Sequence, residues 1–322
     1  MRKDKLSFWI VGIFLTVLLY QTQGFCQHVD NSQKLHLITV KNPEELMDFF
    51  RYNNEVFPLV SAHRGGALID FPENCIATFE NTLKHTFAIM ECDPRYTKDS
   101  LIVIHHDPTL QRTTNGNGKL TDYTLNELKE LKLKDLNGNI TEYKIPTLDE
   151  ALEWAKGKTI LVLDQKDVPV AQRVKKVEEH KAIANVILIV YSFDDAALCH
   201  KLNNNIMMEV MIPDIEKAVE FEKTGVPWRN VVAFVGHNLP VDPKLYEFLH
   251  QKGVLCIAGS SRTIDRKFLT GEVKDYSLLK KDYRGFLEKG IDLIETDLPS
   301  ILGPLLFGTF PGNLSITKYL KY

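Results

Sequence analysis

Short apolar runs alternate with amphipathic stretches along the chain from about residue 59 onward. The apolar runs are rich in β-branched and aliphatic residues and predict strands at residues 59–63, 88–93, 101–106, 159–164, 186–191, 206–211, 231–235, 254–258 and 292–296. The stretches between them predict helices at residues 75–87, 168–180, 194–203, 216–223, 243–252 and 276–289. This alternation is typical of βα units around a parallel sheet.

The nine predicted strands are one too many for an eight-stranded barrel. Only residues 94–100 separate the second run from the third, whereas a parallel crossover needs about a dozen residues or more. We therefore interpret residues 101–106 as an antiparallel hairpin return, which leaves eight parallel strands. The predicted fold class is α/β, a (β/α)8 TIM barrel.

Two segments lie outside the barrel repeat. Glycine- and asparagine-rich turns surround a short predicted helix at 124–133, and we interpret residues 107–150 as an insertion. Residues 27–58, with a predicted helix at 43–52, form an N-terminal extension. Because no biased linker divides the rest of the chain, we expect one barrel domain over residues 59–322.

The first residues have the pattern of an export signal. Arg2, Lys3 and Lys5 precede an apolar run over residues 6–20, and polar and small residues follow. Fifteen helical residues span about 22 Å, less than the roughly 30 Å hydrocarbon core of a bilayer. We expect residues 1–26 to be removed and the protein to be periplasmic or extracellular; a membrane or lipoprotein anchor is the less favoured alternative.

The composition and charge of the chain indicate which class of ligand it binds. The chain has 322 residues, 44% of them hydrophobic, which is enough for a sizeable core. Its 39 basic and 42 acidic side chains give a formal charge of −3, so we expect a small-molecule substrate and no nucleic acid. The five cysteines include no CxxC pair, and we interpret Cys75, Cys92, Cys199 and Cys256 as small apolar core residues.

Polar side chains gather at the carboxyl ends of several predicted strands, where a barrel carries its catalytic groups. Glu91 and Asp93 are two positions apart, so both point to one face of a strand. Two such carboxylates repel each other unless a cation lies between them. Asp164 at the next parallel strand end supplies a third oxygen, and this oxygen-only set suits Mg²⁺ or Ca²⁺. The simpler alternative is a salt-bridged strand end.

Two histidines end predicted strands and are suited to proton transfer near neutral pH. A lone histidine is more often structural, but His63 and His106 both lie at strand ends that converge on the carboxylates. Arg64 and Lys166 add positive charge that suits a phosphate oxyanion. His105 points away from His106, and we interpret it as structural.

The ordered motifs of this site resemble those of the glycerophosphodiester phosphodiesterases, over about residues 59–300. The resemblance rests on His63-Arg64-Gly65, Pro72-Glu73-Asn74, Glu91-x-Asp93 with Tyr96-Thr97-Lys98-Asp99, His106-Asp107-Pro108, Arg112-Thr113-Thr114, residues 145–150 and residues 296–299. It implies a phospholipase C-like TIM barrel that hydrolyses a glycerophosphodiester to glycerol 3-phosphate and an alcohol. The positions that it matches are the metal ligands Glu91, Asp93 and Asp164, the acid and base pair His63 and His106, and the phosphate contacts Arg64 and Lys166.

The sequence departs from the family pattern at three places. Asp164 stands where the family usually has glutamate, so the third ligand is one methylene shorter. Cys75 replaces a threonine after the Pro-Glu-Asn triplet, and residues 254–262 lack the family's frequent tryptophan-threonine pair. The last change alters the wall that faces the alcohol part of the substrate.

Two alternatives remain at this stage. One is the related phospholipase D-like toxin group, which cleaves lysolipid or sphingolipid head groups; Asp164 favours it slightly, and the insertion opposes it. The other is a non-catalytic barrel that binds phosphodiesters at the cell envelope. A binding protein has no need of two histidines beside three carboxylates, which opposes that alternative.

Overall fold

The computed structural model of the chain describes residues 34–55, 57–239, 242–307 and 314–322. The predicted export signal at residues 1–26 lies outside the described residues. Among the helices that are described, none is long and apolar enough to cross a membrane.

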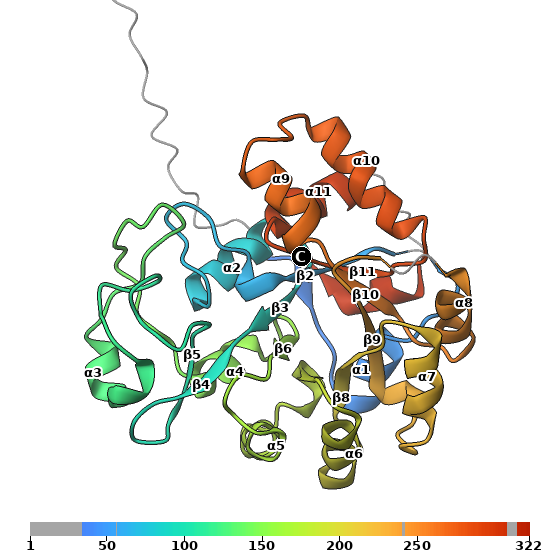
Figure 1. Cartoon of the computed structure of the whole chain (residues 1–322), viewed down its shortest axis with the longest axis horizontal. Helices are drawn as coiled ribbons and strands as arrows, with labels where there is room; N and C mark the ends of the chain where they lie inside the picture. Colours follow the sequence, from blue (N-terminus) through green and yellow to red (C-terminus); the bar gives the residue numbers. More distant parts are fainter. Residues whose placement is uncertain (1–33, 56, 240–241, 308–313) are drawn as a thin grey trace, which may run out of the picture. The chain divides into compact units, whose positions relative to one another are not determined.

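A closed barrel of eight parallel strands forms the centre of the fold, as predicted (Figure 1). Its strands are β2 (Leu59–Ala62), β3 (Ile89–Cys92), β6 (Leu161–Leu163), β7 (Val186–Val190), β8 (Met207–Met211), β9 (Val231–Gly236), β10 (Cys256–Gly259) and β11 (Leu293–Thr296). Consecutive barrel strands pair around the ring, and β11 pairs with β2 to close it. His63, Asp93 and Asp164 each follow directly on a strand, where the backbone leaves the sheet.

Helices connect the barrel strands and cover the outside of the barrel (Figure 1). They are α2 (Ile76–His85), α4 (Leu148–Ala155), α5 (Val170–Glu179), α6 (Phe193–Leu202), α7 (Ile215–Glu222), α8 (Pro243–Gln251), α10 (Tyr276–Leu287) and α11 (Pro299–Phe307). A short helix, α9 (Arg266–Leu269), precedes α10. The sequence did not predict α4 as a helix, although Thr147 and Glu150 form a capping box at its start.

The segment between β3 and α4 forms a small layer beside the barrel mouth. The antiparallel strands β4 (Pro94–Tyr96) and β5 (Ile102–Ile104) make the predicted hairpin. The α-helix of this segment is α3 (Leu125–Lys129), shorter than the predicted 124–133, and a 3-10 turn at Leu120–Asp122 precedes it. The segment packs around a buried cluster that it shares with Cys75 of the loop before α2; the other members are Val103, Leu110, Leu120, Leu128, Leu133 and Ile145.

The N-terminal extension covers the amino end of the barrel. Its α1 (Pro43–Phe49) and β1 (Leu37–Ile38) bring Ile38, Leu46 and Phe50 into one buried cluster with the barrel residues Ile89 and Ile187. β1 pairs antiparallel with β12 (Leu320–Lys321), so segments from both halves of the sequence close this end together.

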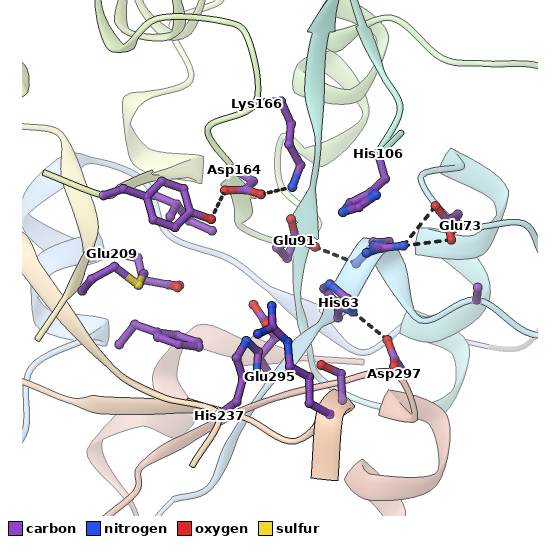
Figure 2. Close-up of a pocket in the computed structure, with 18 of the residues that line it drawn as sticks. His63, Glu73, Glu91, His106, Asp164, Lys166, Glu209, His237, Glu295 and Asp297 are labelled. Carbon is purple, nitrogen blue, oxygen red and sulfur yellow. Dashed lines mark hydrogen bonds and ion pairs between the residues drawn. The ribbon is translucent and has the colours of Figure 1, made fainter. Parts of the chain in front are cut away.

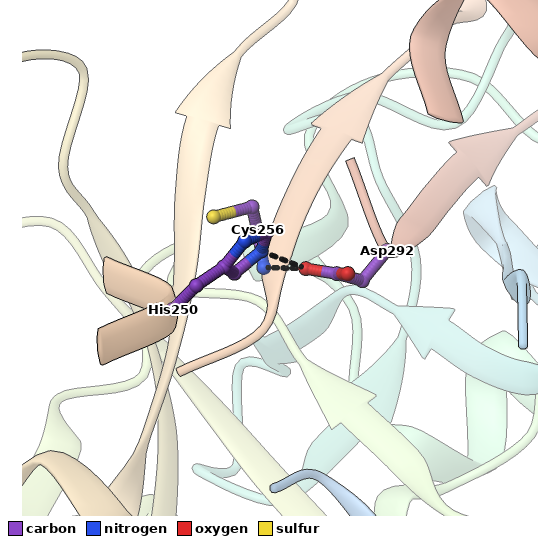
Figure 3. Close-up of side chains that lie close together, drawn as sticks. All are labelled: His250, Cys256 and Asp292. Atoms are coloured by element: carbon purple, nitrogen blue, oxygen red, sulfur yellow. Dashed lines mark hydrogen bonds and ion pairs between the residues drawn. The ribbon is translucent and has the colours of Figure 1, made fainter. Parts of the chain in front are cut away.

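A polar link joins α8 to the first residues of β10 and β11 (Figure 3). Asp292 Oδ2 accepts hydrogen bonds from His250 Nε2 at 2.9 Å and from the backbone N–H of Cys256 at 2.8 Å. Tyr52 stacks on the His250 ring at a centroid distance of 3.6 Å. These contacts tie the extension and α8 to the same edge of the barrel. The Cys256 side chain, like Cys75, Cys92 and Cys199, is buried and free, which agrees with the predicted core role.

Candidate active site

The carboxyl ends of the barrel strands surround a cavity of about 610 Å³. Six of the seven predicted site residues line it: His63, Arg64, Glu91, His106, Asp164 and Lys166. The seventh, Asp93, is 1% exposed and reaches the site through its ion pair with Lys166. The structure therefore brings the whole predicted set together at one end of the barrel (Figure 2).

Glu91, Asp93 and Asp164 form a compact carboxylate cluster. Each offers an oxygen within 4.8 Å of the others, and all three side chains are buried. Burial and the neighbouring charge of Asp93 hold the pKa of Glu91 well above its usual range. Buried carboxylates that repel one another in this way, with no sulfur or imidazole among them, are a donor set that fits a hard divalent cation.

Lys166 partly neutralises the cluster. Its ammonium group lies 3.0 Å from Asp93 Oδ1 and 2.5 Å from Asp164 Oδ2. Burial works against its charge, but the two carboxylates raise the pKa of Lys166, so the side chain stays protonated. Asp164 is also held by the Tyr191 hydroxyl, which donates to its other oxygen at 2.7 Å.

His63 is anchored by an acid on the last barrel strand's loop. Its Nδ1 lies 2.6 Å from Asp297 Oδ1, which leaves Nε2 for the cavity. Burial disfavours the charged ring, but the bond to Asp297 and the charges of Glu91 and Glu295 outweigh it and raise the pKa of His63 to about 10. These interactions favour the charged form of the His63 ring.

His106 also contacts an aspartate through Nδ1, but its surroundings shift its pKa in the opposite direction to that of His63. Its Nδ1 lies 2.7 Å from Asp107 Oδ1. Burial lowers the pKa of His106, and the nearby charges of Arg64 and Lys166 act in the same direction against that of Asp93. Asp107 is itself engaged by Arg112, whose Nε donates to Asp107 Oδ2 at 2.6 Å. The surroundings thus favour the charged ring of His63 and the neutral ring of His106.

The His63-Arg64-Gly65-Gly66 turn shapes the first strand end. Arg64 has a left-handed φ of 52°, and its backbone N–H donates to Glu91 Oε2 at 2.7 Å. A Cβ on Gly65 would lie 2.3 Å from the Phe79 ring, so only glycine fits beneath α2. The Arg64 guanidinium contacts Glu73 at 3.2 Å, while its buried Nε has no hydrogen-bond partner among the described atoms.

Sequence reasoning missed several residues of the site. Four residues orient the predicted ones: Asp297, Asp107, Arg112 and Glu73. They occur in the motifs that carry the resemblance, but the sequence predicted no role for them. Glu209 and Glu295 line the same cavity from β8 and β11 and are 2% and 6% exposed. Each is a single acidic residue inside an apolar strand, so no spacing pattern marked it. His105 is buried, with Nε2 3.1 Å from the Thr109 carbonyl, which agrees with the predicted structural role.

Comparisons with known proteins identify relatives of this chain. The family model described as "Glycerophosphoryl diester phosphodiesterase family" matches residues 63–258. A glycerophosphodiester phosphodiesterase of Caldanaerobacter subterraneus is 30% identical over 254 residues, which cover 76% of this chain and 96% of that protein. A crystal structure of a glycerophosphoryl diester phosphodiesterase from Parabacteroides distasonis superposes with a TM-score of 0.85 at 37% identity, covering 89% of this chain and 99% of that one.

A more distant structure shares the fold. An Oleispira antarctica phosphodiesterase, solved in complex with its product sn-glycerol-3-phosphate, has a TM-score of 0.56 and 24% identity over 77% of this chain and 96% of that one. The barrel, its polar mouth and the matching relatives define this protein as a phosphoric diester hydrolase of the TIM-barrel class. The chain belongs to the glycerophosphoryl diester phosphodiesterase family.

Proposed function

We propose that this enzyme hydrolyses glycerophosphodiesters to glycerol 3-phosphate and an alcohol, with a divalent cation and two histidines. The observation that carries the proposal is the meeting of two aspartate-anchored imidazoles with three buried carboxylates in one cavity. The product that we propose is the one named for the Oleispira phosphodiesterase.

Arg64 and Lys166 bind the phosphate in this proposal. The Arg64 Nε forms no hydrogen bond with a described residue and lies 3.9 Å from Asp93 Oδ2, so its N–H can donate to a phosphate oxygen. The Lys166 ammonium already bridges Asp93 and Asp164, and its third N–H can donate a hydrogen bond to a phosphate oxygen. Both side chains line the cavity beside the imidazoles.

The contrast between the histidines supports a division of roles. His63, whose pKa is raised to about 10, is suited to protonate the leaving alkoxide. His106, whose pKa is lowered, is suited to accept a proton from the attacking water molecule. The anchoring aspartates fix the ring orientation of each, so that Nε2 is the atom that exchanges the proton.

Glu91, Asp93 and Asp164 would hold the cation, either Mg²⁺ or Ca²⁺. The bound cation would polarise a phosphoryl oxygen and neutralise developing charge. The backbone N–H of Arg64 orients Glu91, and Asn74 orients Asp93 with a side-chain hydrogen bond of 2.6 Å.

A substrate panel tests the proposal. The purified enzyme is incubated with glycerophosphocholine and with lysophosphatidylcholine, with and without EDTA, and glycerol 3-phosphate is assayed. We expect glycerol 3-phosphate from glycerophosphocholine, and its loss with EDTA. Cleavage of lysophosphatidylcholine in preference would favour the phospholipase D-like reaction instead, and no turnover of either would favour a binding protein.

We also propose that the enzyme is exported, from the sequence of residues 1–26. Expression of the full chain with fractionation of periplasm, medium and membrane tests this. Mass spectrometry of the mature N-terminus distinguishes cleavage from a retained anchor.

A further inference from the structure

Arg173 on α5 is a completely buried cation that is not paired directly with an acid. Its side chain is 0% exposed, and burial lowers the pKa of its guanidinium to about 10, so it is charged at neutral pH. No carboxylate among the described residues lies within ion-pair distance of it; the charge of Asp164 acts from further away and favours the charged form. An apolar side chain of similar volume would avoid the cost of burying a charge, so the role of Arg173 has to come from the contacts of its guanidinium.

The guanidinium of Arg173 holds the residues on both sides of Asp164. Its Nη1 donates to the backbone carbonyl of Leu163 at 2.9 Å, and its Nη2 donates to the side-chain oxygen of Gln165 at 3.2 Å. Leu163 is the last residue of β6, and Asp164 and Gln165 follow it directly. One side chain on α5 therefore fixes the point at which the backbone carries Asp164 out of the sheet.

The same guanidinium also reaches the neighbouring strand. Its Nη1 donates to the carbonyl of Ile189 on β7 at 2.8 Å. Tyr191, two residues after Ile189, donates its hydroxyl to Asp164 Oδ1 at 2.7 Å. The pairing of β6 with β7 ends at Leu163, so Arg173 joins the two strands where the ladder stops. Arg173 thereby fixes the spacing between Asp164 and the tyrosine that orients it.

The backbone position matters more for an aspartate than for a glutamate. An aspartate has one side-chain torsion fewer between the backbone and the carboxylate, so a shift of the backbone is passed on to the oxygens with less room for correction. Oxygens of Glu91, Asp93 and Asp164 lie within 4.8 Å of one another, and Mg²⁺ demands near-ideal ligand geometry. A fixed strand end at Leu163 supplies the placement that the short side chain of Asp164 cannot adjust.

We propose that Arg173 is a positioning residue, which holds Asp164 in the orientation that binds the divalent cation. It acts through Leu163 and Gln165 and through the end of β7, and it is not among the residues that line the cavity. This inference rests on the proposed function, because it concerns the proposed cation ligand Asp164. Removing a residue that orients a ligand commonly weakens metal binding about 10- to 100-fold.

The test measures the dissociation constants of Mg²⁺ and Ca²⁺ by titration calorimetry of metal-free enzyme. Arg173→Met keeps the length of the side chain without its charge or hydrogen bonds, and it should weaken cation binding about tenfold or more. Arg173→Lys, which keeps the charge and an N–H donor, should lose less. Lys175→Met removes an exposed cation from the same helix and is the matched control, with unchanged affinity. The melting temperature in EDTA verifies that each variant is folded.

A double-mutant cycle separates positioning from a general effect on the fold. In an Asp164→Asn background, Arg173→Met should change the cation affinity less than about threefold, because the ligand through which Arg173 acts is already gone. An equal loss in both backgrounds overturns the inference. A lower melting temperature of Arg173→Met with unchanged cation affinity also overturns it, since the role of Arg173 would then be structural only.

Hydrogen exchange of the metal-free protein gives a readout that needs neither cation nor turnover. Arg173→Met should speed exchange in peptides that contain residues 163–166 and 189–191, and Lys175→Met should not. Unchanged exchange in these peptides overturns the positioning role. If wild type binds neither Mg²⁺ nor Ca²⁺, the metal part of the proposed function fails, and the exchange experiment still decides whether Arg173 fixes Asp164.

Discussion

Asn74 and Asp93 hold each other through two hydrogen bonds that run in opposite directions. The Asn74 side-chain amide donates to Asp93 Oδ2 at 2.6 Å, and the Asp93 backbone N–H donates to Asn74 Oδ1 at 3.0 Å. Asn74 itself has a left-handed φ of 55°. The loop before α2 therefore fixes the orientation of one proposed metal ligand.

Asn74→Ala should weaken divalent-cation binding about 10- to 100-fold, as is usual when a residue that orients a ligand is removed. The dissociation constant for Mg²⁺ or Ca²⁺ from a titration of metal-free enzyme measures this. Asn137→Ala, at an exposed position of the insertion, serves as the control. Unchanged cation affinity in Asn74→Ala would argue against Asp93 as a ligand.

Glu91→Gln should abolish turnover without destabilising the metal-free protein. The pKa of Glu91 is raised by burial and by the charge of Asp93, so a neutral amide relieves repulsion at neutral pH. Turnover and melting temperature in EDTA are compared with those of Glu44→Gln, an exposed acid on α1. EDTA should likewise abolish wild-type turnover, and added Mg²⁺ or Ca²⁺ should restore it. Full turnover of Glu91→Gln would contradict the proposed site.

His106→Ala should lower kcat about 10²- to 10⁴-fold, the usual range for loss of a general acid or base. Melting temperature verifies that the variant is folded. The exposed His85→Ala at the end of α2 is the control. A kcat within about threefold of wild type would remove His106 from the proton-transfer role.

Asp297→Asn should reduce stability in a pH-dependent way. Because the pKa of His63 is raised to about 10 in the folded protein, its pairing with Asp297 stabilises fully below its unfolded pKa of about 6.5. That contribution is lost as pH rises through about 10. Urea unfolding of metal-free proteins should give a difference of about 2 kcal/mol at pH 6 that shrinks by pH 10. A difference in the free energy of unfolding that grows with pH would contradict a raised pKa of His63 in the folded protein.

The barrel and most of the site could be predicted because local patterns encode them. Apolar runs define the strands, and the polar residues after them, such as His63 and Asp164, fall at one end of a parallel barrel by topology alone. The helix α4 could also have been found, since Thr147 and Glu150 form a readable capping box. The predicted insertion at residues 107–150 includes only the first three residues of this helix.

The remaining site residues depend on contacts between distant segments. Asp297 meets His63 across 234 positions, and nothing near Asp297 in sequence indicates an imidazole partner. Glu209 and Glu295 face inward only because the barrel closes with this register. A single acid in an apolar strand is equally compatible with an outward position, so the three-dimensional structure was needed to place it.

The pairing of β1 with β12 has a consequence for how the chain can fold during synthesis. Thr39 is hydrogen-bonded to Tyr319, 280 positions later, so this pairing cannot form until almost all of the chain has been made. Tyr319 is a buried member of the apolar cluster that contains Ile38 and Phe50, and the part of the cluster that it covers is open to solvent until then. Completion of this end of the barrel is therefore one of the last contacts that the growing chain can make, and association with other chains competes with it.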